Sequence, residues 1–202
     1  MKKLILPYLY IGSFLLLTWW VWFGLEMPGA HSNDFLSKLY LSKTLIIANL
    51  LGTLGTLFLI FSITNLLFLV QRKNGLFYLC QFSLLAGLMA YFAVQFGETF
   101  VWPTLALEKP SLLNMDGPLI KPGTLFFMAN VTAGLMATLG IILFSYIMVK
   151  NFHQSKLLGV IYALSFIVFM IGMHPFVRTA GFALWLPVQI ILFHRINNDS
   201  GT

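Results

Sequence analysis

The sequence predicts an all-α, polytopic membrane helix bundle, and three observations lead to that prediction. The 202 residues are 59% hydrophobic and only 9% charged, whereas soluble domains are about 45–50% apolar and about 25% charged. Aromatic side chains make up 16% of the chain. Apolar runs of about 20 residues, the length that crosses a bilayer as a helix, recur along it. Disorder is excluded because it requires low hydrophobicity and high charge, so we expect one transmembrane domain over residues 1–202.

Six apolar runs alternate with polar breaks, and six transmembrane helices are therefore predicted. Their approximate bounds are 4–25, 44–70, 76–100, 124–149, 157–174 and 177–193. The last run is short, contains Pro187 and follows a turn at His174-Pro175, so a five-span alternative with a re-entrant end stays open. The first run is longer than the roughly 7–15 apolar residues of a signal peptide, and we interpret it as a signal anchor.

The basic residues predict an orientation with both termini in the cytoplasm, because short cytoplasmic loops carry an excess of Lys and Arg. One side holds seven of them: Lys2, Lys3, Arg72, Lys73, Lys150, Lys156 and Arg195. The other side holds five: Lys38, Lys43, Lys109, Lys121 and Arg178. Trp19, Trp20 and Trp22 then form an aromatic belt at the outer end of the first span. The net charge of +6 fits attraction to anionic lipid headgroups, and the dispersed basic residues exclude a nucleic-acid partner.

The two outer loops are longer than the inner ones, so specialised structure is expected on that side. In loop 26–43, Asn33-Asp34 is expected to cap the N-terminus of a helix, and an apolar pattern follows at 35–40, which together predict a short helix on the membrane surface. Loop 101–123 carries four prolines, which stiffen a chain and interrupt helices. Their positions are Pro103, Pro110, Pro118 and Pro122. A rigid Pro-rich cap is one interpretation of this loop, and a simple connector is the other.

Polar side chains inside the membrane are the candidates for a functional site, because each is costly there unless it has a partner. Six of them fall in the outer third of the predicted bundle and form a hypothetical ligand-binding cluster: Asn49, Gln95, Glu98, Asn130, His174 and Arg178. Gln95 and Glu98 are three residues apart and share a helix face. The hydroxyl residues of the spans, Thr53 and Thr56 among them, are interpreted as packing groups.

Glu98 and Arg178 form the sharpest pair in this cluster, since each charge could neutralise the other. A structural ion pair that joins two helix ends is the first interpretation of this pair, and a ligand or ion site is the second. His174 lies at a helix break before proline. One histidine and one carboxylate are fewer than the three or four ligands of a zinc site, so no metal is predicted.

The catalytic motifs of common enzyme classes do not occur in the sequence. It has no Gly-x-Ser-x-Gly, His-Glu-x-x-His or phosphate-binding glycine loop. A single cysteine, Cys80, excludes a disulfide framework. These observations favour a non-enzymatic protein without a cofactor.

One half of the chain resembles a bacterial group of small six-span membrane proteins. The residues that carry the resemblance run from Glu98 through Trp102-Pro103 to Ala106, followed by Pro110 and by Asp116-Gly117-Pro118-Leu119. The likeness covers about 98–195. No activity is assigned to this group, so the resemblance implies six helices and a bacterial inner membrane but no function.

Three functional hypotheses follow from these observations. The first is a non-enzymatic membrane protein whose outer polar cluster binds a small or lipophilic ligand, or a partner subunit, within the bilayer. The second is a small transporter or channel. The lack of a charged residue at mid-depth in the predicted spans argues against it. The third is an outer-leaflet lipid-modifying enzyme with His174 as base and Arg178 as anion clamp. The sequence favours the first.

Overall fold

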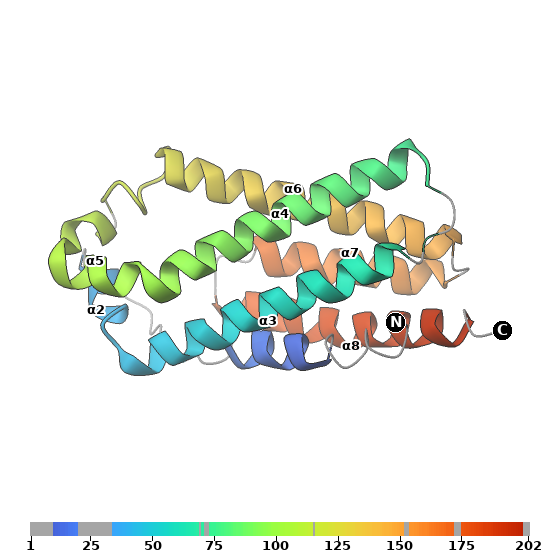
Figure 1. The fold of residues 1–202 in the computed structure, drawn as a ribbon, viewed down its shortest axis with the longest axis horizontal. Coiled ribbons are helices and arrows are strands. Elements are labelled where there is room, and N and C mark those ends of the chain that lie inside the picture. The colour runs from blue at the N-terminus through green and yellow to red at the C-terminus, as the bar shows by residue number, and fades with distance from the viewer. Residues whose placement is uncertain are drawn as a thin grey trace.

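The computed structural model describes residues 10–19, 34–68, 70, 73–114, 116–151, 154–171 and 175–199. These residues are largely helical and include no strand, which confirms the all-α prediction. The main helices are Tyr10–Trp19 at the N-terminal side, α3 (Lys43–Phe68), α4 (Gly75–Phe100), α6 (Leu125–Asn151), α7 (Lys156–Ile171) and α8 (Pro175–Asp199). They run roughly along one axis as an elongated bundle (Figure 1).

Three of the described helices, α3, α4 and α6, are long and apolar enough to cross a membrane. They correspond to the predicted spans 44–70, 76–100 and 124–149. Helix α7 has 16 residues, which is about 24 Å of helix against a hydrocarbon core of about 30 Å. Residues 4–9 and 20–25 of the first predicted span lie outside the described residues. Six spans therefore stay a prediction, and three of them correspond to described helices that are both long and apolar enough to cross a membrane.

Close contact between α4 and α6 depends on glycine. A Cβ added at Gly87 would lie 2.3 Å from the backbone nitrogen of Ala137, and one added at Gly140 would lie 2.4 Å from the Cα of Leu84. In lipid, where apolar side chains gain little from leaving the solvent, small residues favour helix association because they let the backbones approach. Helices α4 and α6 therefore pack backbone against backbone at these glycines, and we call this contact the α4–α6 seam.

The outward surface of the bundle is apolar. Large side chains with about half or more of their surface exposed recur on the four helices α3, α4, α6 and α7, including Phe61, Phe82, Leu135 and Leu164. A soluble protein of this size rarely exposes such extended apolar surface. This distribution is compatible with a protein integral to a membrane.

Three short helices form a cap at one end of the bundle. They are α2 (Phe35–Leu39), α5 (Trp102–Glu108) and the 3-10 helix η1 (Pro110–Leu113), and α2 and α5 lie at the same end in Figure 1. Around Tyr40 and Trp102, whose rings meet edge to face at 4.9 Å, the cap has its own apolar cluster. We call this the cap end.

The structure of the cap differs from two expectations drawn from the sequence, one about its prolines and one about Asp34. Pro103 and Pro110 lie in the first turns of α5 and η1, where proline's missing N–H costs nothing, so these prolines begin short helices. Helix α2 confirms the helix predicted in loop 26–43, but the Asp34 side chain does not cap it. The Asp34 carboxylate instead pairs with Lys38 Nζ at 2.6 Å, and α2 packs on α5 and η1.

Candidate functional site

The structure brings together only part of the predicted cluster. Asn49 on α3 and Gln95 on α4 are buried, each 2% exposed. Glu98 is half-buried one turn further along α4. Asn130 is half-buried on α6, and its side chain makes no hydrogen bond to the other candidates that the structure describes. His174 and the side chain of Arg178 lie outside the described residues.

Asn49 joins α3 to the N-terminal helix. The indole Nε1 of Trp19 donates a hydrogen bond of 2.8 Å to the Asn49 Oδ1. Trp19 reaches this position because Gly52 has no side chain, since a Cβ there would lie 2.6 Å from the indole ring. The predicted aromatic belt is therefore wrong for Trp19, which is buried in the bundle, and Trp20 and Trp22 lie outside the described residues.

Hydroxyl groups join Asn49 to Gln95. The Thr53 hydroxyl lies 2.8 Å from the Asn49 backbone oxygen and 2.8 Å from the Thr99 hydroxyl of α4, to which it can donate its one proton. Thr99 Oγ1 donates in turn to the Gln95 backbone oxygen at 2.7 Å. Thr56 Oγ1, one turn further along α3, contacts Gln95 Oε1 and lies 3.0 Å from the Gly52 backbone oxygen of its own helix. We call Trp19, Asn49, Thr53, Thr56, Gln95 and Thr99 the amide network.

Each of the two carboxamides in this network uses its oxygen and leaves its nitrogen without a partner. Asn49 Nδ2 and Gln95 Nε2 are buried and make no hydrogen bond to any atom that the structure describes. The orientation of Asn49 follows from chemistry, because the Trp19 indole nitrogen is a donor only and must face an oxygen. A buried donor without a partner costs about 1–3 kcal/mol. The network therefore holds two N–H₂ groups that an acceptor oxygen would satisfy.

Glu98 interacts with the cap. The Tyr40 hydroxyl at the end of α2 makes a side-chain hydrogen bond with Glu98, and burial together with the negative charge of Glu98 raises the pKa of Tyr40 well above its usual value of 10. A protonated phenol facing a carboxylate is a donor, so this contact fastens the cap to α4. The predicted ion pair of Glu98 with Arg178 stays a prediction.

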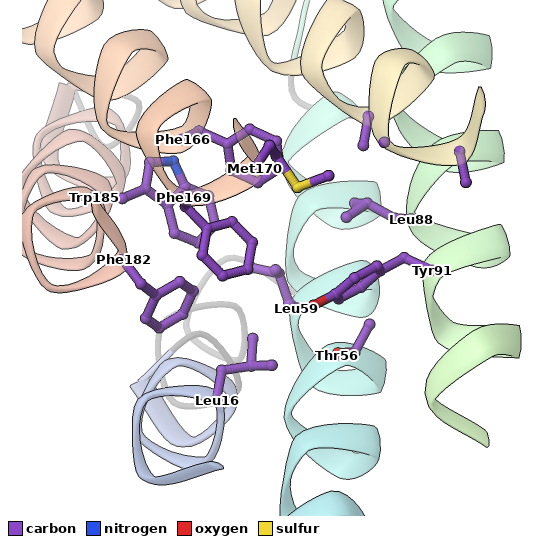
Figure 2. Close-up of a pocket in the computed structure, with 13 residues that line it drawn as sticks. Leu16, Thr56, Leu59, Leu88, Tyr91, Phe166, Phe169, Met170, Phe182 and Trp185 are labelled. Carbon is purple, nitrogen blue, oxygen red and sulfur yellow. The ribbon is translucent and has the colours of Figure 1, made fainter. Parts of the chain in front are cut away.

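A cavity lies in the middle of the bundle beside the amide network. Thr56 and Leu59 of α3 face Leu88 and Tyr91 of α4 across it, as Figure 2 shows. The opposite wall is aromatic and comes from α7 and α8: Phe166, Phe169, Phe182 and Trp185. The wall that the cavity exposes is apolar throughout. Thr56 belongs both to this wall and to the amide network, so the two features adjoin.

A second polar contact lies between α7 and α8. The Tyr162 hydroxyl donates to Gln189 Oε1 at 3.2 Å, in a buried position. The Gln189 Nε2 makes no hydrogen bond to the described atoms. Neither Tyr162 nor Gln189 lines the cavity, so this contact stabilises the α7–α8 pair and lies apart from the amide network.

The described part of the chain holds no group of three or more His, Cys, Asp or Glu side chains placed to bind a metal ion. Cys80 is buried, and its Sγ contacts the Gly140 backbone oxygen at 3.5 Å. The chemistry that this arrangement offers is hydrogen bonding by amides and hydroxyls next to an apolar cavity.

Sequence reasoning missed Trp19, Thr53, Thr56, Thr99 and Tyr40. The threonines carried one usable signal, since Thr53 follows Asn49 by four residues and Thr99 follows Gln95 by four. Residues four apart share a helix face. Which faces of α3 and α4 meet is a property of helix packing, and no single-helix pattern reveals it.

Comparisons with known proteins leave the site to be interpreted from its own geometry. No protein family model, curated protein or solved structure matches this chain.

Proposed function

We propose that this chain is an integral membrane protein that binds a small lipophilic ligand in the half of the bundle nearer the cap. One observation carries the proposal, namely the two buried carboxamide N–H₂ groups of Asn49 and Gln95 that lack acceptors. A ligand oxygen that accepts from these groups would offset the cost of burying them unpaired. The proposed role is binding, without a catalytic step.

The surroundings of the network favour a lipophilic ligand. The cavity beside it has an apolar wall, and ligand sites are typically apolar with a few polar groups that fix orientation. Entry from the bilayer suits such a molecule because the outward faces of the helices are themselves apolar. The proposed ligand contacts Asn49 and Gln95. It does not contact Asn130 or Glu98, whose carboxylate interacts with Tyr40.

The test is retention of a small molecule during purification. The protein is extracted from its host membranes in a mild detergent and measured by native mass spectrometry, as wild type, Asn49→Leu and Gln95→Leu. The control is Asn65→Leu, because Asn65 Nδ2 already donates to the backbone oxygen of Phe61 on its own helix. We expect an added mass on wild type and on the control, and its loss from the other two variants.

Two results would overturn this proposal. One is wild-type protein that carries no added mass above its detergent and bulk lipid. The other is an added mass that Asn49→Leu and Gln95→Leu retain as fully as the control does. Retention of a second polypeptide in place of a small molecule would favour the partner-subunit hypothesis.

We further propose that the chain spans the bacterial inner membrane six times with both termini in the cytoplasm. The distribution of basic residues supports this orientation, and the lengths of α3, α4 and α6 support membrane crossing. In this arrangement the cap lies on the outer side.

A further inference from the structure

Charged side chains are distributed unequally between the two ends of the bundle. Within the described residues, the acidic residues of the cap end are matched in number by lysines. The acidic residues are Asp34, Glu98, Glu108 and Asp116, and the lysines are Lys38, Lys43, Lys109 and Lys121. At the opposite end, one acidic residue, Asp199 at the end of α8, accompanies four basic ones. We call these four residues the basic end: Lys73, Lys150, Lys156 and Arg195.

The packing of α7 against α8 places two of these cations at the same level. The Tyr162 hydroxyl of α7 donates to Gln189 Oε1 of α8, and the two helices run antiparallel. Lys156 precedes Tyr162 by six residues, and Arg195 follows Gln189 by six. Both cations therefore lie about 9 Å of helix beyond this hydrogen bond, in the same direction.

The packing of α6 against α7 brings Lys150 to the same end. Ser145 Oγ of α6 donates to the Gly159 backbone oxygen of α7 at 2.6 Å. Lys150 follows Ser145 by five residues and Lys156 precedes Gly159 by three, which is about 7.5 Å and about 4.5 Å of helix. Lys150 and Lys156 therefore differ in depth by less than one helical turn. Lys73 lies just before α4, whose start appears in Figure 1 on the side opposite α2 and α5, as does the end of α8.

The charges of the basic end are available to an anion. All four side chains are exposed, and none forms an ion pair with a side chain that the structure describes. Lys73 Nζ lies 5.9 Å from the centre of the Phe77 ring, and Lys150 Nζ lies 5.6 Å from that of Tyr146. Contact with a ring places an ammonium group without neutralising its charge. The basic end therefore attracts negative charge, whereas the matched charges of the cap end do not.

Exposed apolar surface begins directly beside these cations. Tyr146, one turn before Lys150 on α6, is 50% exposed, and Leu157, next to Lys156 on α7, is 67% exposed. Lysines at the end of a membrane helix typically extend along apolar surface and keep their charge at the level of the lipid headgroups. A phospholipid matches both features, because its phosphate suits the cations and its acyl chains suit the apolar faces. A free phosphate ion would use the cations alone.

We propose that the basic end is a binding surface for anionic phospholipids. The headgroup phosphate interacts with Lys150 and Lys156, and the acyl chains lie along α6 and α7 beside Tyr146 and Leu157. Arg195 and Lys73 add attraction from the neighbouring helix ends. The attraction to anionic headgroups that the net charge predicts is thereby assigned to one end of the bundle. This inference is independent of the ligand proposed for the amide network.

Native mass spectrometry of the full-length protein in a mild detergent tests the surface. Phosphatidylglycerol and phosphatidylcholine with the same acyl chains are titrated into wild type and into Lys150→Gln/Lys156→Gln. The control is Lys109→Gln/Lys121→Gln, which removes the same charge from exposed lysines of the cap end. Wild type and control should prefer phosphatidylglycerol by at least about tenfold. Each lysine removed from the basic end should lower that preference by about fivefold, and Lys150→Arg/Lys156→Arg should keep it.

Three results would overturn the inference. The first is equal binding of the two lipids by wild type, and the second is an equal loss of preference in the basic-end and cap-end variants. The third is displacement of phosphatidylglycerol by excess inorganic phosphate, which would assign the cations to a free anion. Circular dichroism checks that each variant is folded. If the double variant Lys150→Gln/Lys156→Gln does not fold, the single variants Lys150→Gln and Lys156→Gln are compared with Lys109→Gln in the same titration.

Discussion

The indole nitrogen of Trp19 donates a 2.8 Å hydrogen bond to the side-chain oxygen of Asn49, inside the bundle and 30 residues away in sequence. This contact fixes which end of the Asn49 amide is free. It also fastens the N-terminal helix to α3, where Gly52 leaves room for the indole ring. The candidate site therefore depends on Trp19, which the sequence pattern places in an aromatic belt at the membrane interface.

The hydrogen bond between Trp19 and Asn49 should give a measurable coupling energy between the two residues in a double-mutant cycle. Trp19→Phe leaves the Asn49 oxygen without its donor, and Asn49→Leu leaves the indole N–H without an acceptor, so each should cost about 1–3 kcal/mol of stability. The double variant should be less destabilised than the sum by about 1 kcal/mol or more. Unfolding in detergent, followed by circular dichroism, measures all four proteins. Additive effects would show that the two side chains stabilise the bundle independently.

Tyr40 should make the stability depend on alkaline pH. Burial and the charge of Glu98 raise the pKa of Tyr40 above 10, so the folded protein keeps its proton at a pH where the unfolded chain releases it. This contribution is fully present below about pH 10, the pKa of tyrosine in an unfolded chain, and is lost as pH rises from there toward the folded value. Thermal unfolding between pH 8 and 11 should show a steeper loss for wild type than for Tyr40→Phe.

The control for this experiment is Tyr78→Phe, which changes an exposed tyrosine of α4. It should keep the wild-type pH dependence. If wild type and Tyr40→Phe lose stability in parallel above pH 10, the Tyr40–Glu98 contact does not fasten the cap.

The α4–α6 seam should not tolerate a methyl group. Gly87→Ala places a Cβ 2.3 Å from the Ala137 backbone nitrogen, and backbone cannot move aside as a flexible side chain does. We expect a loss of about 1–3 kcal/mol, the usual cost of overpacking. Gly75→Ala at the start of α4 meets nothing within 4 Å and should be neutral or slightly stabilising. Equal stability of the two variants in chemical unfolding would contradict the packing of this seam.

The orientation can be tested with two added cysteines. Ser111 lies in the cap and Ser155 lies between α6 and α7, and both are exposed, whereas the natural Cys80 is buried. A membrane-impermeant maleimide should label Ser111→Cys in intact cells and label Ser155→Cys only after the membrane is opened. The reverse labelling pattern would place the cap in the cytoplasm.

The sequence predicted the long helices well, because apolar runs of bilayer length leave few alternatives. The run 44–70 became α3 at Lys43–Phe68, and 76–100 became α4 at Gly75–Phe100. The site was harder to predict. Asn49 and Gln95 stood out as amides within apolar runs, but Thr53, Thr56 and Thr99 became part of the network only through the way α3 packs against α4.

The cap was predicted only in outline for a related reason. Prolines in loop 101–123 indicated interruptions of the chain, but a proline in the first turn of a helix promotes that helix, as Pro103 does in α5. Tyr40 carried no signal of its own, since its contact with Glu98 joins residues 58 positions apart in the chain.

The most direct test of the ligand site observes the two amides themselves. Side-chain N–H₂ resonances of ¹⁵N-labelled protein are recorded as purified and again after removal of bound small molecules, with assignments from Asn49→Leu, Gln95→Leu and Asn65→Leu. We predict that the Gln95 and Asn49 resonances shift between the two states while that of Asn65 does not. Unchanged Gln95 and Asn49 resonances, in a sample shown by mass spectrometry to have lost its ligand, would contradict the account.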